Sequence, residues 1–267
     1  MEPQSHHRLP LAGRHAVVTG GGRGIGAAVA DALARAGASV SLIGRNAEKL
    51  RATATRIATE HGVKTSTAIA DVTDEPAVRQ AIGILRDSLG SPAILVNNAG
   101  IGVSSPFLKS GRDFWRKVLD TDLMGAVYCT QAALPDMLQA KWGRIVNIAS
   151  TAGLTGYAYI SAYCAAKHAM VGFTRALAIE TARTGVTVNA ICPSYVDTEM
   201  TSGTIGNIVQ KTGRSEEQAL ASLVAPNPQG RLIQPVEIAE AVVWLCGHNA
   251  ASVTGQSIVI AGGELMP

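Results

Sequence analysis

Three side chains in the middle of the chain have the types and spacing needed to move a proton to or from an oxygen atom. Ser150 follows an apolar run, Tyr163 comes thirteen residues after it, and Lys167 stands four residues beyond the tyrosine. Residues four apart on a helix share one face, so the phenol and the amine would point the same way. An ammonium about 4 Å from a phenol stabilises tyrosinate by up to about 4 kcal/mol, which would lower the phenol's pKa of about 10 towards neutrality. The pattern predicts acid–base catalysis at a carbonyl or hydroxyl group, with Ser150 holding the substrate oxygen.

A tyrosine four residues before a lysine also occurs by chance on helices that carry no site. Tyr157 and Tyr159 lie nearby, but neither is followed by a lysine at the fourth position. A second motif, upstream of these residues, favours the catalytic interpretation of Tyr163.

That second motif is a glycine-rich stretch near the start of the chain, between a strand-like run and a helical pattern. It consists of Gly20, Gly21, Gly22, Arg23, Gly24, Ile25 and Gly26. We expect Gly20 to permit a tight turn, Gly24 to let a pyrophosphate approach, and Gly26 to let the helix pack on the strand. The spacing is GxxxGxG rather than GxGxxG, and a purely structural turn is the alternative. The order strand, glycines, helix predicts a dinucleotide-binding loop.

The residues after the second strand-like run bear on which dinucleotide would bind. A site for NAD usually carries an acidic residue there, but this chain has Gly44 and Arg45, and no acid before Glu48. Arg45 and Arg23 together would bind a 2′-phosphate through charge-assisted hydrogen bonds. We therefore expect NADP(H) in preference to NAD(H). The alternative is that Arg45 lies at a solvated strand end.

Short apolar runs rich in valine, isoleucine and alanine alternate with amphipathic stretches along the chain. The runs are His15–Thr19, Ser39–Ile43, Thr65–Ala70, Ala93–Val96, Gly143–Ile148, Val186–Ile191 and Gln256–Ile260. The helical stretches are Ile25–Ala36, Ala47–His61, Glu75–Leu89, Asp113–Leu138, Tyr163–Thr181 and Val236–Leu245. This alternation predicts one α/β domain over residues 1–267, a Rossmann fold with a doubly wound, seven-stranded parallel sheet and helices on both faces.

Two regions fall outside the alternation. Residues 194–234 contain no strand pattern, and turns are expected at Gly203, Gly206, Gly213 and Pro226–Pro228. A loop region of this length usually carries function, so we expect a flap over the substrate site. Residues 1–10 are expected to form a flexible arm.

Composition excludes several classes of protein. Hydrophobic residues make up 47% of the chain and charged residues 16%, which excludes a disordered chain. Lysine and arginine number 23 against 20 acidic residues, and this balance gives no reason to expect nucleic acid as a partner. No apolar stretch reaches the roughly 18 residues of a membrane span, and the first residues lack a secretory apolar region, so we expect a cytoplasmic protein. The cysteines, far apart and without metal-ligand spacing, predict buried reduced thiols and no metal site; they are Cys129, Cys164, Cys192 and Cys246.

Taken together, these motifs closely resemble the short-chain dehydrogenase/reductase family, over essentially the whole chain. The matching pieces are the glycine loop at 19–26, Asp71 and Val72, the NNAG motif Asn97–Gly100, Ser150, Tyr163–Lys167 and Pro193–Thr198. The resemblance implies that Asp71 and Val72 border an adenine ring. It implies that the NNAG residues support the central strands and line the cofactor; beyond Asn97 these are Asn98, Ala99 and Gly100. It also implies a homotetramer, in which the last two helices commonly pack between subunits.

The resemblance further implies that Ile191, Val196 and Thr198, which flank Pro193, contact the nicotinamide end of the cofactor. Two positions depart from the family's pattern. Asp122 stands where the family carries a catalytic asparagine, and Ser194 stands where a glycine often follows the proline. Asp122 is either a member of a proton relay to the catalytic lysine or a residue at a local helix kink. Ser194 suggests a slightly altered flap geometry.

The residues of the flap bear on which substrate would bind. The flap mixes apolar residues with Lys211, Arg214 and Arg231, which would either meet phosphates of coenzyme A or a phosphopantetheine carrier, or lie in solvent. The flap and the segment after it look most like those of family members that reduce 3-oxoacyl thioesters or oxidise 3-hydroxyacyl ones, as in fatty acid metabolism. Oxidoreduction of a cyclic or aromatic ketone or alcohol is the second hypothesis. A catalytically idle, NADP-binding sensor or scaffold is the third.

Overall fold

A seven-stranded parallel sheet forms the centre of the molecule. The computed structural model describes residues 9–266, so most of the predicted N-terminal arm lies outside the described residues. The strands are β1 (His15–Thr19), β2 (Ser39–Gly44), β3 (Thr65–Ile69), β4 (Ile94–Asn97), β5 (Gly143–Ile148), β6 (Val186–Pro193) and β7 (Ser257–Ile260). Their order across the sheet is β3-β2-β1-β4-β5-β6-β7. The predicted doubly wound α/β fold is confirmed.

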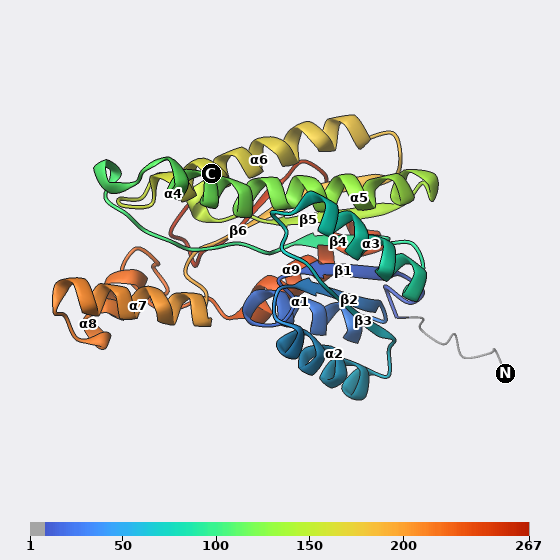
Figure 1. Cartoon of the computed structure of the whole chain (residues 1–267), viewed down its shortest axis with the longest axis horizontal. Coiled ribbons are helices and arrows are strands. Elements are labelled where there is room, and N and C mark those ends of the chain that lie inside the picture. The colour runs from blue at the N-terminus through green and yellow to red at the C-terminus, as the bar shows by residue number, and fades with distance from the viewer. Residues whose placement is uncertain (1–8, 267) are drawn as a thin grey trace.

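Helices cover both faces of this sheet (Figure 1). One layer contains α1 (Gly24–Arg35), α2 (Ala47–His61) and α9 (Pro235–Cys246), and the opposite layer contains α3 (Glu75–Leu89), α5 (Gly125–Gln139) and α6 (Ser161–Thr181). Each layer forms its own apolar core with the strands. Burial between two layers explains why the strands are apolar on both sides, since every residue of β1, β5 and β6 is buried.

The strand order reverses between β1 and β4. The chain segments that follow these two strands therefore lead to opposite sides of the sheet. Open α/β sheets bind ligands in the crevice at such a switch point, beyond the carboxyl ends of the strands. The glycine loop follows β1, the NNAG motif spans the end of β4, and Ser150 and Ser194 follow β5 and β6. The topology therefore gathers the predicted site residues at one edge of the sheet.

The predicted loop region 194–234 is more regular than expected. It contains α7 (Glu199–Thr212) and α8 (Glu216–Val224), which project from one end of the molecule (Figure 1). The turns predicted at Gly203 and Gly206 are wrong, because both glycines lie inside α7; Gly213, with a φ of +71°, does end that helix. The missed signal is the capping box at the start of α8, in which Ser215 and Gln218 each accept a hydrogen bond from the other's backbone N–H.

The predicted helix Asp113–Leu138 is continuous but not uniform. It consists of α4 (Arg112–Leu119), a π-helical turn at Asp120–Met124 (η2), and α5. Single π-turns inside α-helices are frequent at functional sites. Among the described helices, none combines the length and the apolarity that crossing a bilayer requires. The four cysteines are free thiols, three of them buried.

Candidate active site

A large cleft opens at the carboxyl edge of the sheet and takes in the predicted site residues. Its volume of about 1440 Å³ exceeds the roughly 300–1,000 Å³ of a typical small-molecule site. There is room for a dinucleotide and a second molecule. Of the predicted residues, those lining the cleft are Gly20, Gly22, Arg23, Gly24, Ile25, Arg45, Asp71, Val72, Asn98, Ala99, Gly100, Asp122, Ser150, Tyr163, Lys167, Pro193, Val196 and Thr198.

Gly26, by contrast, is buried beneath the loop and does not line the cleft. A Cβ atom on Gly26 would collide with the carbonyl oxygen of Gly20 and with the side-chain amide of Asn98. The absence of a side chain at Gly26 therefore lets the start of α1 lie close to the backbone at the end of β1. Gly20 and Gly24 have φ angles of +65° and +53°, a region that favours glycine. No side chain caps α1, and the N–H groups of an uncapped first turn are suited to binding an anion.

The glycine loop is tied to the NNAG motif by hydrogen bonds around Thr19. The Thr19 hydroxyl accepts from the backbone N–H groups of Asn98 and Ala99, each at 3.0 Å. The Asn98 side-chain amide donates to the carbonyl of Thr19 at 2.9 Å. These bonds fix the glycine loop against the start of the NNAG motif.

Beneath the cleft, a buried row of amide and hydroxyl groups links β4, β5 and α6. The Asn97 side-chain amide donates to Asn147 at 2.8 Å, and that of Asn147 donates to Thr174 at 2.9 Å. Asn97 supports the central strands, as the resemblance implied, whereas Asn147 and Thr174 were not singled out from the sequence. Ile191 is fully buried in the core and does not line the cleft, so its expected contact with the nicotinamide end is wrong.

Charged side chains gather at one end of the cleft. Arg23 Nη1 lies 2.6 Å from Glu199 Oε2, and Lys49 Nζ lies 3.2 Å from Glu199 Oε1. Arg45 Nη1 lies 3.6 Å from Asp71 Oδ2. Burial tends to raise the pKa of Asp71, but hydrogen bonds from Thr73 and the charge of Arg45 hold that pKa below its usual value.

Sequence reasoning missed two members of this charged group, Lys49 and Glu199. Lys49 lies in the first turn of α2, four residues beyond Arg45, and that spacing was an available signal. Glu199 is the first residue of α7. Nothing in the local pattern indicated that α7 would reach back to the glycine loop.

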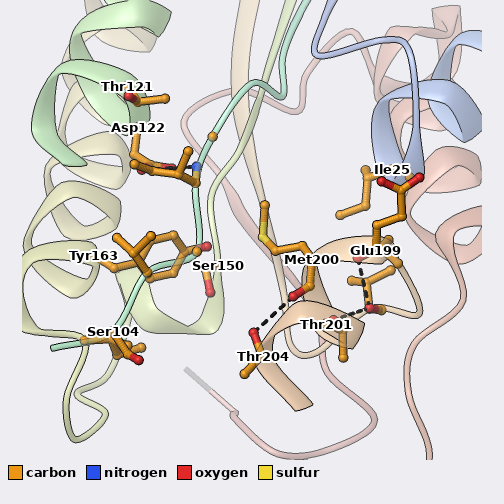
Figure 2. A pocket seen from close by; sticks show the side chains of 18 of the residues that line it. Ile25, Ser104, Thr121, Asp122, Ser150, Tyr163, Glu199, Met200, Thr201 and Thr204 are labelled. Carbon is orange, nitrogen blue, oxygen red and sulfur yellow. Dashed lines mark hydrogen bonds between the residues drawn. The ribbon is translucent and has the colours of Figure 1, made fainter. Parts of the chain in front are cut away.

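The predicted serine, tyrosine and lysine meet at the other end of the cleft. Figure 2 shows the Tyr163 hydroxyl directed towards Ser150, on the wall opposite Ile25 and Met200. Lys167 Nζ lies 5.5 Å from the centre of the Tyr163 ring and donates a hydrogen bond of 3.0 Å to the carbonyl of Ile148. The strand end and the helix face therefore bring the three side chains together as predicted.

The ionisation of this group differs from the prediction in one respect. Burial raises the pKa of Tyr163, and the opposing effects of the Lys167 charge and the Ser150 hydroxyl do not reverse the rise. The expected net lowering of this pKa is therefore absent in the structure, although Lys167 does act in the expected direction. For Lys167, burial lowers the pKa, but the negative charges of Asp122 and of Tyr163 in its phenolate form outweigh burial and raise it. The amine is therefore a protonated ammonium at neutral pH.

Asp122 lies at an irregular point of the helix and also beside the predicted catalytic lysine. It lies in the π-helical turn, and its Oδ1 atom is 3.5 Å from Lys167 Nζ. The carboxylate also accepts a hydrogen bond of 3.1 Å from the N–H of Ile101. Burial raises the pKa of Asp122 against the pull of Lys167, since only 1% of the residue is exposed. Asp122 thus forms a buried pair with the lysine from an irregular point in the helix.

The remaining wall of the cleft comes from the segment 194–234. Ser194 donates its hydroxyl to the carboxylate of Glu264, so this departure from the family's pattern ties the start of the segment to the C-terminal region. Met200 and Ile208 of α7 add apolar surface. Lys211 lines the cleft, whereas Arg231 lies outside it, paired with Glu237 at 2.7 Å.

Comparison with known proteins gives consistent matches. A family model described as short chain dehydrogenase matches residues 14–207. The 3-oxoacyl-(acyl-carrier-protein) reductase of Aquifex aeolicus is 37% identical, over 96% of this chain and 98% of its own length. The D-beta-hydroxybutyrate dehydrogenase of Rhizobium meliloti is 35% identical, over 93% and 97%. An actinorhodin polyketide ketoreductase solved with NADPH has a TM-score of 0.90 at 38% identity, over 94% of this chain and 97% of that chain.

Proposed function

The chain belongs to the short chain dehydrogenase family, and on that premise we propose that it interconverts a ketone and a secondary alcohol, with 3-oxoacyl and 3-hydroxyacyl thioesters as substrates. It is an oxidoreductase of a family that uses a nicotinamide cofactor. One observation carries the proposal: the Tyr163 hydroxyl points towards Ser150 on one wall of a cleft that Lys167 and the glycine loop also line.

The cleft fits a dinucleotide. The uncapped N-terminus of α1 and the loop from Gly20 would hold the pyrophosphate, and Val196 and Thr198 would face the nicotinamide end. A bound nicotinamide supplies or accepts a hydride. The chain's own residues manage the proton: Tyr163 donates it to the substrate oxygen from its hydroxyl, and Ser150 donates a hydrogen bond to the same oxygen.

The ammonium of Lys167 stabilises the phenolate that proton donation leaves behind. Its distance of 5.5 Å from the ring centre and its burial make that charge effective. We assign Asp122 to the same proton path, because its carboxylate is the acidic partner of Lys167 at 3.5 Å.

We further propose NADP(H) as the preferred cofactor. Arg23, Arg45 and Lys49 line the end of the cleft where an adenosine ribose would lie, and three cations suit a 2′-phosphate better than a bare hydroxyl. The structural match to a ketoreductase solved with NADPH supports this choice.

The thioester substrate fits the outer part of the cleft. Apolar side chains such as Met200 and Ile208 suit an acyl chain, while Lys109, Lys211 and Arg214 suit the phosphates of coenzyme A or of a phosphopantetheine carrier. Relatives named as a 3-oxoacyl-(acyl-carrier-protein) reductase and as a hydroxybutyrate dehydrogenase support this class. We propose that the reaction belongs to fatty acid metabolism. Oxidoreduction of a cyclic or aromatic ketone or alcohol is a second candidate, and the match to a polyketide ketoreductase supports a ketone as the group that reacts.

We treat residues 1–267 as one domain in which 194–234 forms a flap over the substrate. We also propose a cytoplasmic homotetramer. Ile179 on α6 is 80% exposed and Trp244 on α9 is 47% exposed, which leaves apolar surface on both helices for contacts between subunits.

Loss of NADPH absorbance separates these proposals. Turnover of acetoacetyl-CoA supports a thioester substrate, and turnover of cyclic ketones alone supports the second candidate. Binding of NADPH without turnover of either class contradicts the enzymatic proposal and supports an idle sensor or scaffold. NADH serves as the comparison cofactor in each assay.

A further inference from the structure

Glu199 is an exposed residue whose carboxylate is nevertheless engaged at two points. Its Oε2 atom lies 2.6 Å from Arg23 Nη1, and both of its oxygens lie 3.2 Å from Lys49 Nζ. The three residues belong to separate elements, since Arg23 precedes α1, Lys49 lies in the first turn of α2, and Glu199 opens α7. One carboxylate therefore joins the flap to both helices that border the glycine loop.

The place that this carboxylate occupies is part of the cradle for an anion. Arg23 stands directly before the uncapped end of α1, and the Cβ of Lys49 lies 3.2 Å from where a Cβ on Gly22 would sit. The Thr198 methyl group lies 3.2 Å from the corresponding position on Gly24. The start of α7 thus touches the loop itself, and Figure 2 shows Glu199 on the same wall as Ile25.

We propose that Glu199 competes with the 2′-phosphate of the cofactor for Arg23 and Lys49, and thereby sets how strongly the site prefers NADP(H) over NAD(H). The inference rests on the proposed function. Carboxylates and phosphates make the same charge-assisted contacts with guanidinium and ammonium groups. In the chain by itself, Glu199 holds two of the three cations that the phosphate needs.

Charge balance explains why carboxylate and phosphate compete instead of sharing the site. Hydrogen bonds from Arg23 and Lys49 hold the pKa of Glu199 below its ordinary value, so its carboxylate is ionised at neutral pH. A phosphate monoester brings close to two further negative charges. Arg45 is the cation best placed to meet it first, because its contact with Asp71 is longer, at 3.6 Å, and its side chain is 73% exposed.

The competition also links the two parts of the cleft. Glu199 is the first residue of α7, and the next residue, Met200, lines the substrate part of the cleft together with Ile208. A phosphate that takes Arg23 and Lys49 releases the N-terminal contact of this helix. NAD(H), which lacks that phosphate, leaves the contact intact.

Binding of nucleotide fragments tests the proposal without any hydride transfer. Calorimetry at one ionic strength compares 2′,5′-ADP with 5′-AMP, which differ by the 2′-phosphate. For Glu199→Gln, we expect 2′,5′-ADP to bind about three- to tenfold more tightly than to the wild type, with 5′-AMP within about twofold. Glu216→Gln is the matched control. It removes the same charge from the flap, and Glu216 forms no ion pair with any residue between 9 and 266.

The outcomes are distinct. A gain for 2′,5′-ADP alone, confined to Glu199→Gln, supports the competition. Equal affinities of the two variants for 2′,5′-ADP overturn the competition. Weaker binding of 2′,5′-ADP by Glu199→Gln also overturns it, because it would mean that Glu199 closes over the bound nucleotide. If the wild type binds neither fragment, the proposed dinucleotide-dependent function fails instead.

Discussion

The two ends of the cleft are built on opposite electrostatic principles. At the chemical end, Lys167 and Asp122 are 4% and 1% exposed, and each is held by a backbone hydrogen bond as well as by the other. At the charged end of the cleft, which contains Arg23, Arg45 and Lys49, the side chains of Arg23 and Arg45 are 59% and 73% exposed, and each pairs with a single carboxylate. One end has fixed charges and the other has exchangeable ones.

This difference suits the roles that we propose for the two ends. A buried ion pair that loses one partner leaves an uncompensated charge in a medium of low dielectric constant, so the arrangement resists change. Exposed pairs contribute little to stability and re-form easily with another ion. The buried end can hold a proton donor in one geometry, and the exposed end can admit and release a phosphate.

Loss of the Tyr163 hydroxyl is the largest effect that we expect. Tyr163→Phe removes the proton donor, so turnover of acetoacetyl-CoA with NADPH should fall by about 10²–10⁴-fold. Affinity for NADPH should stay within about twofold, because only the transition state needs that proton. Tyr128→Phe, which removes a phenol outside the cleft, is the control. If Tyr163→Phe kept its turnover, Tyr163 would not be the proton donor.

Asp122 tests whether the buried pair is rigid. Asp122→Asn keeps an acceptor for the N–H of Ile101 but removes one of the charges that raise the pKa of Lys167. Turnover at pH 7 should stay within about tenfold of the wild type. Asp122→Ala should lose about 3 kcal/mol of stability, measured by denaturant unfolding, because the ammonium is left buried without its carboxylate.

The pH dependence of Asp122→Asn has a defined sign. A lysine whose folded pKa is raised contributes stability that is complete below its unfolded pKa and is lost as the pH rises through the folded value. The difference in unfolding free energy between wild type and variant should therefore be largest at neutral pH. It should shrink above pH 10.5, the ordinary pKa of lysine. The alkaline limb of the activity profile should move to lower pH. A profile identical to that of the wild type would argue against Asp122 in the proton path.

Arg45 tests the exchangeable end. Arg45→Asp places an acceptor for a ribose hydroxyl where a cation for the phosphate stood, so the ratio of kcat/KM for NADPH to that for NADH should fall by about 10–100-fold. Arg51→Asp, on the exposed side of α2, makes the same change of charge outside the cleft. An unchanged cofactor preference in Arg45→Asp would contradict the NADP(H) assignment.

The pair Arg231–Glu237, away from the cleft, shows what an exposed pair contributes to stability alone. Hydrogen bonds from Arg231 lower the pKa of Glu237 to about 2, so its contribution is present above pH 4.5 and is lost as the pH falls towards 2. Glu237→Gln should lower Tm at pH 7 by no more than about 2 °C, with a smaller difference at pH 3. A larger fall in Tm would mean that this exposed ion pair contributes more to stability than exposed pairs usually do.

The sequence predicted the buried end better than the exposed one. Tyr163 and Lys167 are related by helix periodicity, and Ser150 by the end of a strand, so local spacing was enough to place them. Glu199 reaches Arg23 across 176 residues of chain. Side chains that meet only through tertiary packing leave no periodic signal, and the same reason applies to the row from Asn97 to Thr174.

The fold was predictable for a similar physical reason. Alternation of apolar runs with amphipathic stretches determines a parallel sheet with few alternatives. The flap helices were missed because their glycines suggested turns, whereas Gly203 and Gly206 are tolerated inside α7. Glycine in an exposed helix costs only about 1 kcal/mol, which the contacts of the flap with the rest of the chain can offset.

The π-helical turn at Asp120–Met124 has a consequence for how this chain can vary in length. Each residue advances an α-helix by about 100°, and the wider turn absorbs one residue more than the regular helix would. Deleting a single residue there would restore a uniform helix and rotate everything before it relative to α5. The apolar face of α5 would stay against the sheet while Asp122 turned away from Lys167, so the loss of a single codon would break the Asp122–Lys167 pair.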